Sequence, residues 1–167
     1  MVHPLTFDEI AVGAQWRSRA RTVTETDIVN FACITGDFDP LHVDHRHAAQ
    51  SHFRRPIAHG LLGMAWVAGL GSHSPLVDTL AFLGIEQWEF RRPIYVGDTV
   101  HVVTEALSKE SSGRKRGAVR WHRSLLNQDD QIVQEGVFRT LVARAQGVNV
   151  EPAEHGGRRP SGKRLVG

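Results

Sequence analysis

The sequence predicts an α+β domain in which a curved antiparallel sheet wraps around one buried helix. Segments with helical periodicity occupy the first half of the chain, and strand-like segments joined by short turns occupy the second half. That order is typical of α+β proteins, and 167 residues suffice for one complete hydrophobic core. Between the halves, residues 60–70 are apolar on every side, so we expect a helix that is buried all around.

Composition and charge predict one domain followed by a basic tail. Hydrophobic residues make up 41% of the chain and charged residues 23%, which is ordinary for a globular protein. The net charge is −1 over residues 1–143 and +3 over residues 144–167, so the basic character lies at the end of the chain. We expect a single domain over 1–143 and a largely disordered tail, rich in Gly, Pro and Arg, over 144–167.

Several classes of partner are disfavoured. The longest apolar run, 60–70, is too short to cross a bilayer, and the first residues lack the basic-then-apolar order of a signal peptide. The basic pairs 54–55 and 91–92 are not interleaved with aromatic residues, which argues against a nucleic-acid interface. Cys33 is the single cysteine and falls in an apolar helical pattern, so we predict that it packs in the core. We expect a cytoplasmic protein without membrane or nucleic-acid partners.

The elements before residue 36 follow from alternation and capping. Residues 16–23 alternate bulky and charged side chains, which predicts one exposed or edge strand. Thr24 with Asp27 three residues later forms a capping-box pattern, and a helix should begin there and end at Gly36. Asp44 similarly predicts the start of a short helix that runs to Gln50.

The second half predicts four strands in an antiparallel meander. They cover residues 80–90, 99–107, 116–127 and 131–143, and Pro93 indicates an edge or a bend. In the preceding helix, glycines at 63 and 69 each cost up to about 1 kcal/mol relative to alanine. That cost suggests that the sheet approaches the helix backbone closely.

Asp37 and His42 are the strongest chemical signal. In one helix their spacing would place them roughly 140° apart, and Pro40 disfavours a helix through this segment, so we predict a loop on which both converge. A carboxylate and an imidazole at one point hold water and move protons near neutral pH. The alternative is a turn capped by Asp37, with His42 a solvated surface residue.

Two further patterns carry weaker signals. His59-Gly60 precedes the apolar helix, whose first N–H groups would stabilise an oxyanion; the alternative is ordinary helix entry. Five histidines between positions 42 and 59 suggest a metal, but none is spaced like a helical zinc motif and no cysteine assists, so we predict no metal site.

Three segments together resemble a known family. They are I-T-G-D-F-D-P-L-H (34–42), R-P-I-A-H-G-L-L (55–62) and F-R-R-P-I-Y-V-G-D-T-V (90–100). This pattern, within a match over residues 7–143, resembles the MaoC-like dehydratases and, among them, the (R)-specific enoyl-CoA hydratases. The resemblance implies a hot-dog fold, a curved sheet around a central helix, and a homodimer or larger homo-oligomer.

The resemblance also implies the chemistry. Asp37 and His42 would hold the water that adds to a 2-enoyl-CoA thioester to give the (R)-3-hydroxyacyl-CoA, or the reverse. The Gly60 N–H would polarise the thioester carbonyl. No cofactor is implied beyond the coenzyme A of the substrate, and no metal. Substrate contacts would come from five further residues, which are Asp39, Pro40, His59, Arg91 and Arg92.

Two departures from the family pattern leave the substrate open. Asp39 stands where the family usually has Asn, and Ala68 stands where some of these enzymes have a serine in the central helix. Two other functions remain possible on the same fold. One is a thioesterase, and the other is a non-catalytic acyl-CoA-binding or regulatory protein.

Overall fold

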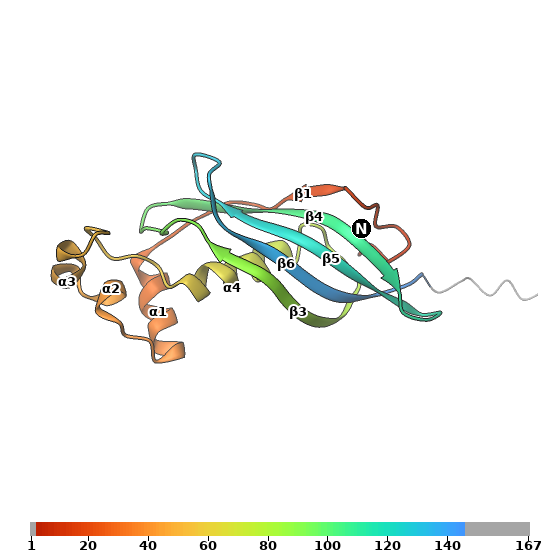
Figure 1. Ribbon diagram of the computed structural model, residues 1–167, viewed down its shortest axis with the longest axis horizontal. Coiled ribbons are helices and arrows are strands. Elements are labelled where there is room, and N and C mark those ends of the chain that lie inside the picture. The colour runs from red at the N-terminus through yellow and green to blue at the C-terminus, as the bar shows by residue number, and fades with distance from the viewer. Residues whose placement is uncertain (1–2, 146–167) are drawn as a thin grey trace, which may run out of the picture.

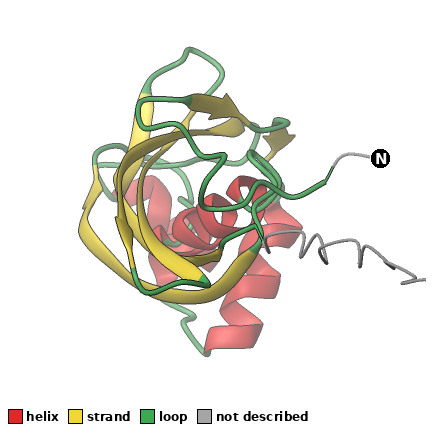
Figure 2. Ribbon diagram, turned by 90° about the vertical axis from the view of Figure 1, so that its right-hand side faces the viewer, coloured by secondary structure: helices red, strands yellow, loops and turns green. Residues whose placement is uncertain are grey.

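A curled antiparallel sheet encloses a central helix, which is the hot-dog arrangement. The computed structural model describes residues 3–145. Its strands are β1 (Gln15–Arg17), β2 (Arg21–Thr22), β3 (Thr79–Phe90), β4 (Thr99–Ser111), β5 (Arg116–Leu126) and β6 (Ile132–Ala143). Its helices are α1 (Glu25–Thr35), α2 (Pro40–Val43), α3 (His45–Gln50) and α4 (Gly60–Gly71). The sheet curves around α4, and α1–α3 gather beyond one end of the sheet (Figures 1 and 2).

The α1 helix forms as its capping pattern predicts. The Thr24 hydroxyl accepts from the backbone N–H of Asp27, the Asp27 carboxylate accepts from the N–H of Thr24, and Gly36 ends the helix at φ 79°. Only the Ile28 and Ala32 side of α1 is buried. The prediction that Cys33 lies in the core is wrong, because its side chain is exposed. Cys33 follows the buried Ala32, and one residue of helix rotates the side-chain direction by about 100°, away from the core.

The single strand predicted over residues 16–23 is interrupted. It forms two short strands, and both pair with β4, Gln15 opposite Glu105 and Arg21 opposite Val100. The hydroxyl of Ser18 between them accepts from the N–H of Val102, so a side chain replaces part of the regular ladder.

Pro40 begins a helix, which contradicts the predicted loop over residues 37–43. Asp39 is the N-cap of α2, and its carboxylate accepts from the N–H of Leu41. A proline excludes a helix that runs through it but favours the first helical position, where no N–H partner is needed. His42 is therefore on a short helix, and Asp37 is on the loop before it. The Asp44 cap of α3 is confirmed.

The predicted meander is correct for three strands and wrong for the first. The order in the sheet is β1-β4-β5-β6-β3, so β3 pairs with β6 and lies at the edge. The connection after β3 does not close a hairpin, because it turns toward the segment before α4. There Ala58 donates its N–H to the carbonyl of Ile94, and Ile57 pairs with Tyr95.

Only one side of the α4 helix is buried within this chain, whereas the prediction was burial all around. Leu62, Trp66 and Val67 are buried in the core, whereas Leu61 is 60% exposed. Close approach of the sheet explains only one of the two glycines, Gly63 and Gly69, that were considered in α4. A Cβ at position 63 would lie 2.2 Å from Nε2 of Gln134, but a Cβ at position 69 would meet nothing within 4 Å.

Two sequence-based expectations concern other parts of the chain. None of the helices within residues 3–145 is long and apolar enough to cross a membrane. The disordered tail predicted over 144–167 falls, except for its first two residues, outside the described residues.

We predict that Asp27→Ala lowers the free energy of unfolding by about 1 kcal/mol at neutral pH, because it removes half of the capping box. Burial acts to raise the pKa of the Asp27 carboxyl, but the hydrogen bonds from Thr24 and Arg21 lower it overall. A lowered folded pKa means that this contribution is complete above the unfolded value of about 3.9 and is lost as the pH falls through the folded value. Urea unfolding at several pH values measures it.

The matched control is Glu25→Ala, which removes an exposed first-turn carboxylate outside the capping box. We expect it to change stability by less than about 0.5 kcal/mol. A stability loss for Asp27→Ala that is equal at pH 7 and pH 3 would contradict the assignment.

Candidate active site

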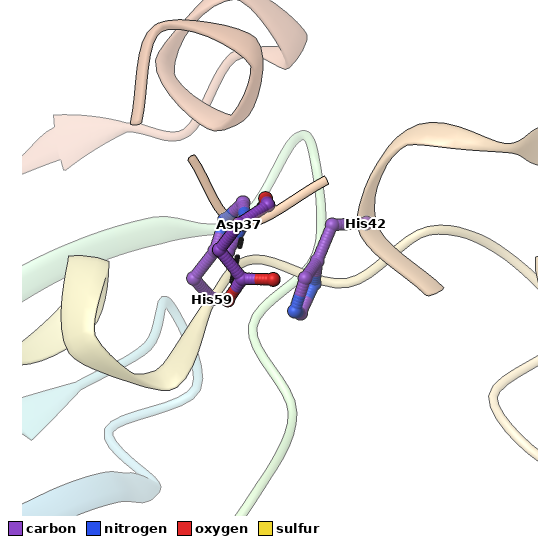
Figure 3. A group of neighbouring side chains, drawn as sticks. All are labelled: Asp37, His42 and His59. Carbon is purple, nitrogen blue, oxygen red and sulfur yellow. Dashed lines mark hydrogen bonds and ion pairs between the residues drawn. The ribbon is translucent and has the colours of Figure 1, made fainter. Parts of the chain in front are cut away.

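Asp37, His42 and His59 converge from three segments into one cluster. Asp37 follows α1, His42 lies on α2, and His59 is the residue before α4. One ligating atom of each side chain lies within 4.8 Å of the others. Figure 3 shows the Asp37 carboxylate and the His42 ring facing the same space, with His59 beside them. The predicted convergence of Asp37 and His42 is present, although His42 reaches it from a helix.

A backbone carbonyl fixes the tautomer of neutral His42. Its Nδ1 lies 2.8 Å from the carbonyl oxygen of Ile57. Because a carbonyl oxygen only accepts, Nδ1 carries the proton, and Nε2 of the neutral ring is left with a lone pair. His42 therefore presents a proton acceptor on the side away from Ile57.

His59 is buried and contacts both of the other two residues. Its side chain is 2% exposed, and its Nε2 donates to the main-chain oxygen of Asp37 at 2.9 Å. Its ring packs against that of His42, with centroids 3.8 Å apart, and its Nε2 lies 4.0 Å from the Asp37 carboxylate. The predicted substrate contact of His59 stays a prediction, since the contacts in the structure are to Asp37 and His42.

The loop around Asp37 is held by short-range hydrogen bonds. The Thr35 hydroxyl accepts from the N–H of Asp37, and the Asp37 carboxylate accepts from the N–H of Asp39, each at 3.3 Å. Asp39 is occupied as the cap of α2, with Pro40 as its first residue. These two residues shape the loop, and a direct contact with substrate stays a prediction.

A cavity of about 350 Å³ joins His42 to the start of α4. Its lining includes His42, Phe53, Ile57, Gly60, Phe90, Arg91, Arg92 and Gln134. No side chain caps the N-terminus of α4, so the partial positive charge of its first turn is available at this cavity. A Cβ on Gly60 would lie 2.8 Å from the Phe90 ring, so glycine leaves room where a side chain would not.

The two predicted arginines differ in how strongly they are held. Arg91 is ion-paired with both Glu135 and Glu89. Arg92 donates one hydrogen bond, to the carbonyl of Ile132 at 3.1 Å. Both line the cavity, but Arg92 has the guanidinium that is freer to bind an anion.

Sequence reasoning missed Gln134. This residue of β6 is 2% exposed, its Nε2 donates to the carbonyl of Gly60 at 3.0 Å, and its Oε1 has no partner among residues 3–145. The available signal was an amide at even spacing from Phe138 and Val142, which places it on the apolar face of the strand. Gln134 holds the first turn of α4 against the sheet and contributes a buried polar atom beside the cavity.

The cluster also contains the donor types of a metal site. A carboxylate and two imidazoles suit several transition metals. However, Nδ1 of His42 and Nε2 of His59 already bond to main-chain oxygens, and His45 pairs with Glu25 outside the cluster. The hydrogen-bonded arrangement suits acid–base chemistry, and the absence of a metal stays a prediction.

Together, the curled sheet and the placement of Asp37 and His42 beside a helix N-terminus are the features of a hot-dog protein with a candidate acid–base site. The chain belongs to the MaoC-like family, since the family model described as "MaoC like domain" matches residues 9–125.

Relatives of the chain include hydratases. It is 38% identical over 103 residues to Protein MaoC of Klebsiella aerogenes, covering 60% of this chain and 31% of that protein. It is 35% identical over 95 residues to the (R)-specific enoyl-CoA hydratase of Rhodospirillum rubrum, covering 56% and 64%. The matches thus span about a third of the first protein and slightly under two thirds of the second.

Solved structures agree in fold. A monoamine oxidase regulatory protein from Archaeoglobus fulgidus superposes with a TM-score of 0.80 at 33% identity, covering 86% of this chain and 97% of that one. A MaoC-like dehydratase from Rhodospirillum rubrum gives 0.75 at 29% identity, covering 85% and 99%. A protein of Mycobacterium tuberculosis described as having a double hot-dog fold gives 0.78 at 20% identity, covering 86% and 46%, and it supports the fold alone.

We predict that Gly63→Ala destabilises the protein by about 1–3 kcal/mol, because the new Cβ would force Gln134 away from the Gly60 carbonyl. Gly69→Ala is the matched control in the same helix. With free space at that position, it should be neutral or stabilising by up to about 1 kcal/mol. Urea unfolding of both variants measures the difference, and equal effects would contradict the described packing.

Proposed function

We propose that this protein is a hydro-lyase that adds water to a 2-enoyl-CoA thioester, or removes it from the (R)-3-hydroxyacyl-CoA. The observation that carries the proposal is the placement of His42 and Gly60 on one cavity, with the Asp37 carboxylate within reach of His42. Membership of the MaoC-like family and the hydratases among its relatives support the same class of reaction. A CoA thioester substrate also fits the expected place of action, the cytoplasm.

In the hydration direction, one water molecule binds between Asp37 and His42. The lone pair on Nε2 of His42 takes a proton from the water as its oxygen bonds to C3 of the substrate. The electron pair of the C2–C3 double bond moves toward the thioester carbonyl. The Asp–His pair then returns a proton to C2, so that one O–H bond breaks while a C–O and a C–H bond form.

The N-terminus of α4 would stabilise the charge that develops on the thioester oxygen. The Gly60 N–H is part of an uncapped first turn, and such N–H groups act most strongly where water is excluded. The absent Cβ of Gly60 lets a carbonyl group approach, because Phe90 occupies the neighbouring space. His59 contributes indirectly, by holding the Asp37 main chain and the His42 ring.

Coenzyme A would be held by the basic side of the cavity. Guanidinium groups bind phosphates well, and Arg92 has no carboxylate partner within the described residues. Arg55 stacks over the ring of Tyr95 at 4.0 Å, near the same segment. We assign phosphate binding first to Arg92 and second to Arg91, whose charge is already shared with two glutamates.

The functional unit would be a homodimer or a larger homo-oligomer. The edge strand β3 exposes five large apolar side chains, Leu80, Phe82, Leu83, Ile85 and Phe90, and α4 exposes Leu61. An unpaired apolar edge is a surface that a second copy can cover. Among structural neighbours, one protein of Mycobacterium tuberculosis has a double hot-dog fold, and another comes from the ChsH1–ChsH2 complex.

We predict that Asp37→Asn and His42→Ala each reduce the hydration rate at least about 100-fold, because each removes one proton-transfer group. Loss of the enoyl absorbance of crotonyl-CoA and of longer enoyl-CoAs measures the rate. His45→Ala is the control, since His45 is an exposed histidine paired with Glu25. Circular dichroism establishes that each variant is folded. A folded Asp37 or His42 variant with a near-normal rate would contradict the roles assigned.

The same assay separates the alternatives when free thiol is followed in parallel. Loss of enoyl absorbance without thiol release supports the hydratase. Thiol release identifies a thioesterase on the same fold. A folded protein that binds enoyl-CoAs but changes none of them would support a non-catalytic role, which is the alternative favoured by the similarity to the regulatory protein of Archaeoglobus fulgidus.

A further inference from the structure

A second cavity, of about 280 Å³, lies beside the C-terminal half of α4. Its lining includes Ala68 and Ser72 near the end of the helix, Phe82 of β3, and Phe138 and Thr140 of β6. Arg123 of β5 also lines it and is the one charged residue that does so in the described part of the chain. The mechanism proposed above does not use this arginine.

Arg123 is a buried cation without a carboxylate partner. It is 8% exposed, and within residues 3–145 no carboxylate oxygen lies within the 4.0 Å of an ion pair. Its Nη2 donates to the carbonyl of Gly71 at 3.2 Å, its guanidinium lies 5.0 Å from the centre of the Phe138 ring, and its Nε is buried without any partner. Buried charges in proteins are normally paired, so this one is incompletely compensated.

The charge persists at physiological pH. Burial lowers the pKa of Arg123 to about 10, which leaves the group protonated at neutral pH. The carbonyl end of α4 offsets part of the cost through its partial negative charge. That contact explains why the residue is tolerated, but it leaves Nε unsatisfied and does not explain a cation on a cavity wall.

The second cavity lies along the same helix as the candidate active site. Gly60 is at the beginning of α4 and Gly71 at its end, about 16 Å apart at the usual rise of a helix. Gln134 lines the first cavity, and Phe138 and Thr140 line the second. These three residues are an even number of positions apart, so they lie on the same face of β6. An acyl chain whose carbonyl is held at Gly60 and which follows α4 would end near Arg123.

Small residues on α4 make this position open. A Cβ at Gly71 would lie 2.8 Å from Nη1 of Arg123, so the guanidinium occupies space that any other residue at 71 would fill. Ala68 presents a single methyl group to the cavity. The helix therefore leaves room both for the arginine and for a group that reaches it.

We propose that Arg123 is a specificity-determining residue that binds the terminal carboxylate of a medium-length carboxyacyl group. The substrate class would then be the CoA monothioesters of α,ω-dicarboxylic acids. This inference rests on the proposed function, because it takes the thioester carbonyl to be bound at Gly60. A carboxylate would accept hydrogen bonds from the guanidinium and complete the pairing that the chain itself leaves open.

Binding of saturated thioesters tests the proposal independently of catalysis, because they carry no double bond to hydrate. Isothermal titration would compare dodecanedioyl-CoA with dodecanoyl-CoA, and sebacyl-CoA with decanoyl-CoA, each pair differing by a terminal carboxylate or methyl group. We expect wild-type protein to bind the carboxylated member of at least one pair at least about tenfold more tightly. Arg123→Met should abolish or reverse that preference, and Arg123→Lys should retain part of it.

The outcomes separate this inference from the proposed function. Equal binding of both members of each pair, or tighter binding of the methyl-terminated members, by wild-type protein overturns the role of Arg123 and leaves the acyl-CoA class intact. Failure to bind any of the four thioesters overturns this inference, and the crotonyl-CoA assay then decides the proposed function separately. A purely structural role for Arg123 would lower the thermal stability of the methionine variant without changing the ratio of the two affinities. The wild-type ratio decides the matter even if that variant does not fold.

Discussion

The contact between α4 and the concave face of the sheet positions both cavities and the start of the helix at the candidate active site. Two polar side chains from the sheet reach glycines of the helix, Gln134 at Gly63 and Arg123 at Gly71. Because neither glycine has room for a Cβ, the helix axis is set close to the sheet. Gln134 also bonds to the first carbonyl of the helix. The uncapped N-terminus of α4 therefore points at the cavity that His42 lines, and its C-terminus meets a buried cation.

The candidate active site depends on main-chain oxygens as much as on side chains. The carbonyl of Ile57 selects the tautomer of His42, and the carbonyl of Asp37 binds the buried ring of His59. Each contact joins segments that are distant in sequence, so the geometry of the acid–base pair depends on how α1, α2 and the start of α4 pack together. These contacts explain how a site built on a loop and a four-residue helix is held in place.

Sequence reasoning succeeded where the physics is local. The capping box of α1, the Asp44 cap of α3, the glycine that ends α1 and the boundaries of β4 to β6 follow from neighbouring residues, and the structure confirms them within a few positions. It failed where two local rules compete. A proline interrupts a helix from within but favours its first position. The segment at Pro40 became helical because Asp39 caps it. Cys33 lay in an apolar pattern, but the core contacts α1 on a narrower side than the pattern suggested.

The fold class and the convergence of Asp37 and His42 could be predicted from the sequence, because they follow from periodicity and from the three spaced motifs. The pairing of β3 with β6 at the sheet edge could not, since strand pairing depends on long-range contacts rather than on strand content. The same holds for the buried positions of His59, Gln134 and Arg123. Their side chains look like ordinary polar residues in the sequence. The folded chain removes all three from water, and the packing of α4 on the sheet directs Gln134 to the first cavity and Arg123 to the second.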